Sequence, residues 1–278
     1  MGSIPAQKGH KGISPKPDVL GGNQIMGIDI TMTATRRPGI LDITLNSFYN
    51  LMFKPKASLI NNVFVNIDPV GPGTLNDTID ICRKYFPHDK LIIHSPNTPS
   101  FGKAFVWTWT QTLSTESACV FHLEDDWELQ REVDLHQMFL LLYLYPDLAL
   151  LRLSAFPSGA HIMKCWDKFI SWNGTFFEVP PNLRGLLGFC GHPSLIRKDF
   201  IRHITPYMDE DKNPEKQIKG NHPVFGPYIR GSRFGVYQKQ DSEALVRDIG
   251  RQWMIKTGYR KAGSKAYFMQ WERQEETQ

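Results

Sequence analysis

The first part of the chain switches repeatedly between two hydrophobic periods. From residue 28 to residue 33 every second side chain is apolar, which is the period of a strand. Leu41, Leu45, Phe48 and Met52 then recur at the spacing of one helix face. The same reasoning predicts further strands over 59–67, 90–94, 118–123 and 148–153, and further helices over 75–86, 101–113 and 133–145.

Strands that alternate with helices in this way predict an α/β fold with a mostly parallel, Rossmann-like sheet and helices on both faces. After residue 155 the alternation fades and glycine, proline, tryptophan and phenylalanine become frequent, so we expect an irregular second half laid over the sheet. Within it, residues 195–201 have the pattern of a short helix. We therefore expect a single domain over 25–278, made of two halves, 25–155 and 156–278.

Residues 1–24 precede this pattern and carry Lys8, Lys11 and Lys16 among prolines and glycines. The segment lacks apolar periodicity, which predicts a disordered basic leader. The alternative is a basic arm that contacts a polyanion.

Composition places the chain among ordinary globular proteins. Of its 278 residues, 41% are hydrophobic and 22% charged, and its net charge of +4 is too small to indicate nucleic-acid binding by itself. Its four cysteines contain no CxxC pair, which disfavours a zinc knuckle or a disulfide framework. The longest apolar run, 139–145, is too short for a membrane span, and the first residues do not form a secretory signal. We expect a cytoplasmic protein, in the host cytoplasm if it is viral.

Three adjacent carboxylates, Glu124, Asp125 and Asp126, follow the apolar strand predicted over 118–123. Like charges this close raise one another's pKa unless a cation neutralises them. Oxygen ligands of this kind suit Mg²⁺ or Mn²⁺, which typically also take oxygens from a substrate phosphate. The cluster therefore favours a metal site at the carboxyl ends of the strands, where such sheets bind ligands. A solvated acidic loop is the alternative.

Two common nucleotide motifs are missing from the sequence. It has no GxxxxGK[ST] loop, which disfavours a P-loop nucleotide site. It also has no GxGxxG after the first strand, which disfavours a dinucleotide-dependent oxidoreductase.

Five segments, in order, resemble the GT-A fold glycosyltransferases, the nucleotide-diphospho-sugar transferases, in a family-2-like form. They are the first strand with its loop (31–38), the second strand up to Asp68 (63–68), the helix opening 101–104, the acidic triplet as an EDD form of the DxD motif, and 246–250 followed by Trp253. The resemblance spans roughly residues 27–260.

The resemblance implies roles for the matching residues. In the EDD motif Asp126 would bind the metal and Glu124 the ribose. Asp248 stands where many family members have a histidine metal ligand, and an aspartate is also a sound ligand for a hard cation. The implied contacts to the nucleotide come from Thr33, Thr35, Arg36, Asp68, Lys103, Glu124 and Asp125.

Two further roles are suggested by the second half. An inverting transferase needs a carboxylate that takes the proton from the acceptor hydroxyl. Glu215, at a predicted helix start, is the first candidate and Asp211 the second, an exposed acidic cluster being the alternative. Arg251 lies in a basic stretch near Asp248 and could offset charge on a diphosphate leaving group, although a solvated basic face would look the same.

We therefore expect a metal-dependent, inverting glycosyltransferase (EC 2.4) that uses Mn²⁺ or Mg²⁺ and a nucleotide-diphosphate sugar, with a UDP-sugar favoured. The first half would bind the nucleotide sugar and the second the acceptor. The basic leader is compatible with a hydroxymethylated base in DNA as acceptor, as in viral DNA modification, and a saccharide or protein hydroxyl stays open. The rivals are a metal-dependent nucleotidyltransferase, which usually has a glycine-rich basic loop where this chain has only Gly39, and a non-catalytic binding module.

Overall fold

The computed structural model describes residues 27–156, 171–239, 242–257, 259–262 and 270–273. The predicted leader, 1–24, lies outside the described residues. Strands of the main sheet are β1 (Ile28–Thr35), β2 (Ile60–Asp68), β3 (Leu91–His94), β4 (Cys119–Glu124), β6 (Leu148–Leu153), β7 (Ser171–Trp172), β8 (Phe177–Glu178), β9 (Ser194–Arg197) and β10 (Arg233–Tyr237). The helices are α1 (Pro38–Phe48), α2 (Leu75–Tyr85), α3 (Phe101–Thr112), α4 (Leu135–Leu144), α5 (Arg184–Leu187), α6 (Lys198–Ile204), α7 (Pro214–Gln217), α8 (Gly226–Gly231) and α9 (Gly250–Thr257).

The main sheet has nine described strands in the order β3-β2-β1-β4-β9-β6-β10-β8-β7. The first four are parallel, and β10 is parallel to β6. Strand β9 runs antiparallel to both of its neighbours, β4 and β6. These mostly parallel pairs confirm the predicted Rossmann-like α/β fold. Because β1, β2 and β4 run in the same direction, their carboxyl ends meet at one edge of the sheet.

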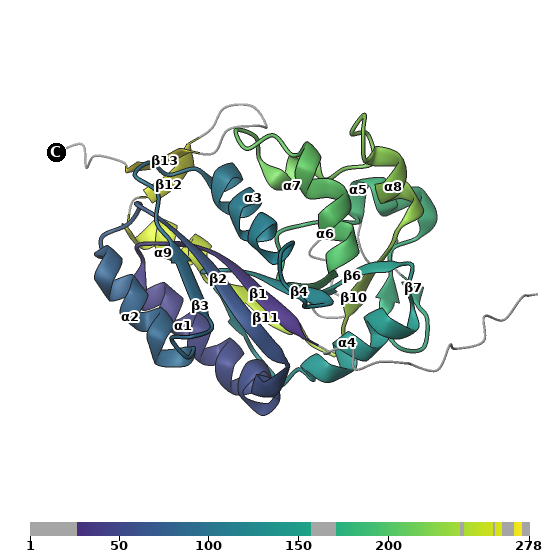
Figure 1. Ribbon diagram of the computed structural model, residues 1–278, viewed down its shortest axis with the longest axis horizontal. Helices are drawn as coiled ribbons and strands as arrows, with labels where there is room; N and C mark the ends of the chain where they lie inside the picture. The colour runs from purple at the N-terminus through teal and green to yellow at the C-terminus, as the bar shows by residue number, and fades with distance from the viewer. Residues whose placement is uncertain (1–26, 157–170, 240–241, 258, 263–269, 274–278) are drawn as a thin grey trace, which may run out of the picture.

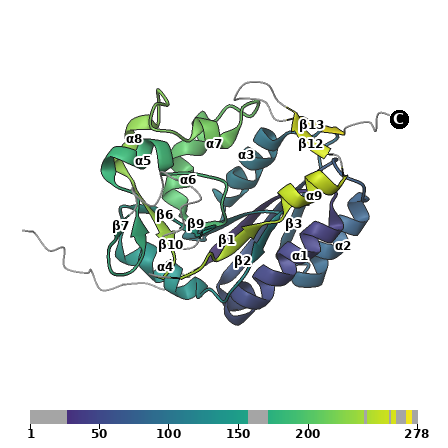
Figure 2. The same cartoon turned by 180° about the vertical axis from the view of Figure 1, so that it is seen from behind.

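Helices cover both faces of the sheet, as Figures 1 and 2 show from opposite sides. One apolar core joins the sheet to α1 and α4 and includes Leu41, Phe48 and Leu142. The other joins it to α3, α6 and α8 and includes Trp109 and Phe200. Strands β4, β6 and β9 contribute side chains to both cores. Strand β1 lies inside the sheet between β2 and β4 and is buried at all eight positions.

Local signals begin the helices where the periodicity predicts them. Thr74 and Asp77 form a capping box at the start of α2. The Ser100 hydroxyl caps α3 and the Asp134 carboxylate caps α4. Pro38 occupies the first turn of α1, so that helix begins directly after the loop that follows β1.

The prediction of a helix over 195–201 is wrong in its first part. Residues Ser194–Arg197 form β9, and the helix α6 begins only at Lys198. Leu195 and Ile196 are both buried, one in each core, as a strand between β4 and β6 requires. The second half thus supplies β7 to β10 of the main sheet, beside loops and short helices.

A small antiparallel ladder connects the two halves next to the acidic triplet. It pairs β5 (Trp127–Leu129) with β11 (Val246–Asp248), so that Asp248 lies opposite Trp127. The backbone N–H of Ile249 also donates to the carbonyl oxygen of Asp126 at 2.9 Å. A second ladder pairs β12 (Tyr259–Ala262) with β13 (Gln270–Arg273). Across the described ranges, no helix combines the length and apolarity that a bilayer span requires.

Candidate functional site

A pocket opens where the carboxyl ends of β1, β2 and β4 meet the first turn of α3. Ligands of open α/β sheets bind at this edge. Its walls are formed by Thr33, Ala34, Thr35, Arg37, Asp68, Phe101, Ala104, Glu124, Asp125 and Asp126. The structure therefore brings Thr33, Thr35, Asp68 and the acidic triplet together, although they are up to 93 positions apart in the sequence (33 to 126).

Asp125 is the buried anchor of this pocket. Its Oδ2 accepts hydrogen bonds from the N–H and hydroxyl of Thr35 at 2.8 and 3.0 Å. Its Oδ1 accepts from the Arg37 guanidinium at 2.5 Å, in an ion pair whose side chains are only 5% and 3% exposed. Burial raises the pKa of the Asp125 carboxyl, and the Arg37 charge opposes that shift. The hydrogen bonds hold Asp125 in one orientation facing the end of β1.

Arg37 ties the acidic triplet to two other elements. The same guanidinium nitrogen lies 3.3 Å from Asp126 Oδ2, and Nε donates to the Thr35 hydroxyl at 2.6 Å. The guanidinium carbon lies 4.9 Å from the centre of the Trp253 ring in α9. Burial alone would lower the pKa of Arg37, but the carboxylates of Asp125 and Asp126 outweigh it and raise the pKa. Arg37 is therefore a fixed positive charge among the carboxylates.

Arg36 was expected to contact the nucleotide, but Arg37 is the arginine that lines the pocket. The backbone of Arg36 is held by the turn after β2, through bonds to Val70 and Gly73, and its side chain is half-buried. Both arginines precede Pro38 and both match the same loop. Only the turn direction after Thr35 decides which one faces Asp125, and the sequence carries no signal for that direction.

Asp68, at the end of β2, is oriented by its neighbours. Its Oδ1 accepts from the Asn66 amide at 2.8 Å, and its Oδ2 accepts from the Ser100 N–H at 3.0 Å. Burial raises the pKa of Asp68, and Asn66 and Ser100 oppose the rise. His94 Nδ1 lies 2.7 Å from Asn66 Oδ1, so a chain of polar groups runs from β3 to the pocket.

Asp126 and Asp248 approach one another through their chain segments. Gly250 lies so close to Asp126 that an added Cβ would sit 2.2 Å from Oδ2. The Asp248 carboxylate, however, accepts hydrogen bonds from the N–H groups of Gly250 and Arg251 at 2.9 and 3.2 Å. It therefore caps the start of α9. The assignment of both aspartates to one metal stays a prediction.

The carboxylates of Glu124 and Glu215 both lie next to Gly191. An added Cβ at Gly191 would lie 2.5 Å from Glu124 Oε1 and 2.9 Å from Glu215 Oε1. The Gly191 N–H donates to Glu215 Oε1. Glu215 lies in the first turn of α7, at a helix start as predicted, and the Asn213 side chain is the cap. The structure thus brings the Glu215 carboxylate close to that of Glu124 at Gly191.

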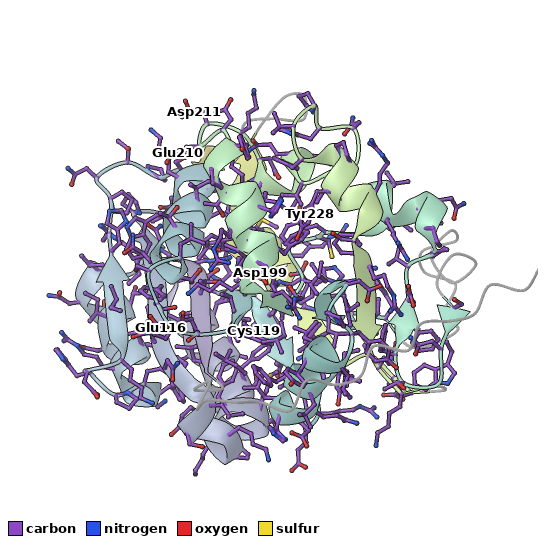
Figure 3. All side chains as sticks on the ribbon, turned by 45° about the vertical axis from the view of Figure 1, so that its right-hand side comes forward. Glu116, Cys119, Asp199, Glu210, Asp211 and Tyr228 are labelled. Atoms are coloured by element: carbon purple, nitrogen blue, oxygen red, sulfur yellow. The ribbon has the colours of Figure 1, made fainter. Side chains whose placement is uncertain are left out.

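Asp211 and Lys103 pair with each other at the outer edge. Lys103 Nζ lies 3.7 Å from Asp211 Oδ1, and both side chains are mostly exposed. Figure 3 shows Glu210 and Asp211 near the upper edge of the molecule, above Glu116 and Cys119. Asp211 is therefore not brought to the triplet as Glu215 is. Arg251 is exposed on the first turn of α9, next to Asp248.

The donor atoms fit a divalent cation that arrives with a phosphate-bearing substrate. Among the residues that the structure describes, no three His, Cys, Asp or Glu side chains form a complete cage. Mg²⁺ commonly takes only one or two carboxylates from the protein and completes its shell with water and substrate phosphates. Asp126, partly exposed at the pocket, suits this arrangement better than the buried Asp125, whose oxygens are already occupied.

Comparison with known proteins gives structural neighbours only. No family model and no curated protein matches the sequence. A 4-diphosphocytidyl-2C-methyl-D-erythritol synthase from Anaerococcus prevotii DSM 20548 shares 13% identity at a TM-score of 0.42, over 81% of this chain and 94% of its own. A CMP:2-keto-3-deoxy-manno-octonic acid synthetase complexed with CTP shares 12% identity at a TM-score of 0.47, over 83% of this chain and 97% of its own.

These neighbours correct the expected enzyme class. Their names belong to enzymes of cytidine-nucleotide chemistry, and neither is a glycosyltransferase, so the expectation of an inverting EC 2.4 enzyme is withdrawn. At such low identity the likeness concerns the fold alone. The activity has to be argued from the residues of this site.

Proposed function

We propose that the protein is a metal-dependent nucleotidyltransferase, which binds a nucleoside triphosphate and transfers its nucleotidyl group to an acceptor oxygen, with release of pyrophosphate. The observation that carries the proposal is the buried cluster of Arg37, Asp125 and Asp126 at the carboxyl ends of β1 and β4. It holds a fixed cation and a partly exposed carboxylate side by side, in a pocket beside the basic loop after the first strand.

The two sides of the pocket have different chemistry. Asp68 is held by Asn66 and Ser100, so its carboxylate has a defined direction in which to accept hydrogen bonds from a nucleoside. Arg37 and the half-buried Arg36 supply positive charge where the phosphates would lie, since both follow β1 directly. A divalent cation bound with the nucleotide would neutralise phosphate charge, and we assign Asp126 to hold it because its carboxylate is partly exposed at the pocket.

The acceptor would approach from the side of Gly191. Glu215 and Glu124 flank this residue, and Glu215 already accepts a hydrogen bond from its N–H. A carboxylate fixed in this way can take a proton from an acceptor hydroxyl as the oxygen attacks the α-phosphorus. We propose Glu215 for this role, because Asp211 is paired with Lys103 at the exposed edge.

The test begins with binding. The thermal midpoint is measured with each of four nucleoside triphosphates and with UDP-, GDP- and CDP-sugars, with and without Mn²⁺ or Mg²⁺. A ligand at 100 times its Kd that binds only the folded state stabilises it by about 2.7 kcal/mol. We expect a metal-dependent shift with at least one triphosphate. Asp126→Asn should lose it, and Asp211→Asn, an exposed control, should keep it.

Pyrophosphate release is then measured with a panel of acceptors that includes small sugars and DNA with hydroxymethylated bases. Release that depends on both acceptor and metal supports the proposal. Stabilisation by a nucleotide sugar but by no triphosphate, with release of a nucleoside diphosphate, would overturn it.

A further inference from the structure

Cys190 lies in the loop between α5 and β9, directly before Gly191. It differs from Cys82 and Cys119, which are buried, because part of its surface is exposed. Gly191 is the residue that Glu124 and Glu215 flank. Any change at Cys190 is therefore one peptide unit away from the proposed acceptor side.

Two cations from different elements gather on the loop around Cys190. Arg152, a buried residue of β6, places Nη1 3.5 Å from the Cys190 sulfur and 2.8 Å from the Leu187 carbonyl oxygen. Lys219, directly after α7, donates from Nζ to the carbonyls of Leu186 and Phe189 at 3.1 and 3.0 Å. Both cations are anchored by backbone oxygens of the same loop, so their charges stay close to the sulfur.

His192 completes the surroundings of the sulfur. It hydrogen-bonds Cys190 through its side chain and its backbone. The His192 ring is held against Trp127, with ring centres 4.9 Å apart. The charged and titratable groups facing this loop are thus Arg152, His192 and Lys219, together with the carboxylates of Glu124 and Glu215 at Gly191.

The cysteines of the described chain differ sharply in acidity. Burial raises the pKa of the Cys190 thiol, but the charges of His192 and Arg152 and the hydrogen bonds of His192 outweigh it and lower the pKa to about 6. Burial raises the pKa of Cys82 and of Cys119 to about 12. The two buried thiols therefore serve as internal controls.

We propose that Cys190 is a covalent modification site for soft electrophiles, because its partly exposed sulfur lies in the cationic surroundings formed by Arg152, Lys219 and His192. In the reaction the thiol proton has already passed to solvent, and the sulfur lone pair attacks the electrophilic carbon. With iodoacetamide as the probe, a C–S bond forms, the C–I bond breaks, and iodide leaves with the bonding electrons.

An adduct on Cys190 should block transfer while sparing nucleotide binding. An added Cβ at Gly191 would stand 2.5 and 2.9 Å from the carboxylate oxygens of Glu124 and Glu215, so we expect a bulky group on the adjacent Cys190 to displace these two side chains. The pocket at the ends of β1, β2 and β4 is lined by Glu124 but not by Cys190 or Gly191. This consequence rests on the proposed function, whereas the reactivity of the sulfur does not.

The reactivity is measured on the full chain in a Cys165→Ser background, because Cys165 lies outside the described residues. Peptide mass spectrometry follows iodoacetamide labelling of Cys190, Cys82 and Cys119 between pH 5 and pH 9. We expect Cys190 labelling to reach half its maximal rate near pH 6, where its pKa of about 6 places the midpoint. The two buried cysteines should stay unlabelled while the protein is folded.

The pH profile is more informative than a single rate. At pH 7 a thiol of pKa about 6 is ionised roughly 90-fold more than one with the ordinary pKa of 9.0. A thiolate of lower pKa is also less nucleophilic, with a Brønsted slope of about 0.4–0.5. The expected labelling rate of Cys190 at pH 7 is therefore only about fourfold above that of an ordinary thiol. At pH 6 the same calculation gives Cys190 a labelling rate about twentyfold above that of an ordinary thiol.

Charge variants test the cause. Arg152→Gln and Lys219→Gln should each move the labelling midpoint to higher pH, and Lys219→Gln remains a test if Arg152→Gln does not fold. Lys216→Gln, an exposed neighbour on α7, is the matched control and should leave the midpoint unchanged. A wild-type midpoint near 8.5–9, typical of an unperturbed thiol, or no response to either charge variant, would overturn the proposal.

Activity separates this proposal from the proposed function. The labelled protein should keep its nucleotide-dependent thermal shift and lose transfer, and Cys190→Ser should transfer normally with or without iodoacetamide. If no acceptor supports transfer, the labelling profile still decides whether Cys190 is a thiolate. Labelled protein that transfers at the full rate would refute the predicted block.

Discussion

Replacing Arg37 by methionine removes the guanidinium and keeps much of the apolar volume. Asp125 would then stay buried with hydrogen bonds from Thr35 but without its countercharge. The side chains of the pair are 3% and 5% exposed, so solvent screens the loss little. Removing one partner of a buried ion pair typically costs about 3–5 kcal/mol, and we expect the lower end because the Thr35 bonds remain.

Urea unfolding measures this loss. With a slope of about 2–3 kcal/mol per molar urea, a loss of about 3 kcal/mol lowers the midpoint by about 1–1.5 M. Asp125→Asn in the same background removes the unpaired charge and should restore part of the stability. The non-additivity of the two substitutions then gives the coupling energy of the pair.

The pH dependence supplies an independent check of the same reasoning. Burial raises the pKa of Asp125, and Arg37 opposes that rise. Without Arg37 the folded pKa lies further above the unfolded one, so the protonated acid is favoured in the folded state. A group of this kind contributes stability below its unfolded pKa and loses it as pH rises through the folded pKa. The deficit of Arg37→Met should therefore shrink as the pH falls from 7 toward 4.

Arg36→Met is the matched control, since the described contacts of Arg36 are made by its backbone. It should change stability by about 1 kcal/mol or less. If Arg37→Met is as stable as Arg36→Met at pH 7 and shows no dependence on pH, the buried ion pair does not have the role assigned to it.

Burial lowers the pKa of His122 from its ordinary value of 6.5 to about 3. Between these two pH values the unfolded state binds more protons than the folded state, so stability falls as the pH falls. The protein should lose about 2 kcal/mol of unfolding free energy between pH 8 and pH 5 from this group, and urea unfolding of His122→Asn should show a flatter profile than His88→Gln, an exposed control. The unfolding free energy of Gly191→Ala should lie within about 1 kcal/mol of the wild-type value, because only the carboxylate ends of Glu124 and Glu215 must move. Its rate of pyrophosphate release should nevertheless fall. Gly102→Ala should instead be destabilised by about 1–3 kcal/mol in thermal or urea unfolding, because its Cβ would meet backbone carbonyls.

Periodicity was sufficient to predict the parallel part of the fold. Strands β1 to β4 and β6 alternate with long helices, and the caps at Thr74, Ser100 and Asp134 reinforce each helix start. Strand β9 was not predicted because its apolar residues run on into those of α6, so that 195–201 together have the pattern of a short helix. Its conformation is set by β4 and β6 on either side, which are distant in sequence. Such tertiary pairing overrides local preference.

In the candidate site, too, one part could be predicted from the sequence and another part depends on tertiary contacts. The position of the triplet after β4 could be predicted, because strand ends of a parallel sheet share an edge. The roles of Arg37 and Gly191 could not, since each depends on contacts across the fold. Arg37 depends on the direction of one turn, and Gly191 on two carboxylates that approach from separate elements.

The acidic triplet, a single motif in sequence, is divided by the structure into three separate environments. Asp125 points into the fold and binds Arg37 and Thr35, so its carboxylate holds the loop after β1 in place. Glu124 belongs to the α3 face of β4 and meets Gly191, whereas Asp126 lies against Gly250 beside the β5–β11 ladder. Successive residues at the end of a strand face different directions, so three adjacent carboxylates need not share one ligand. The buried middle acid fixes the geometry, and under the proposed function Glu124 would serve the acceptor side of the pocket and Asp126 the nucleotide side.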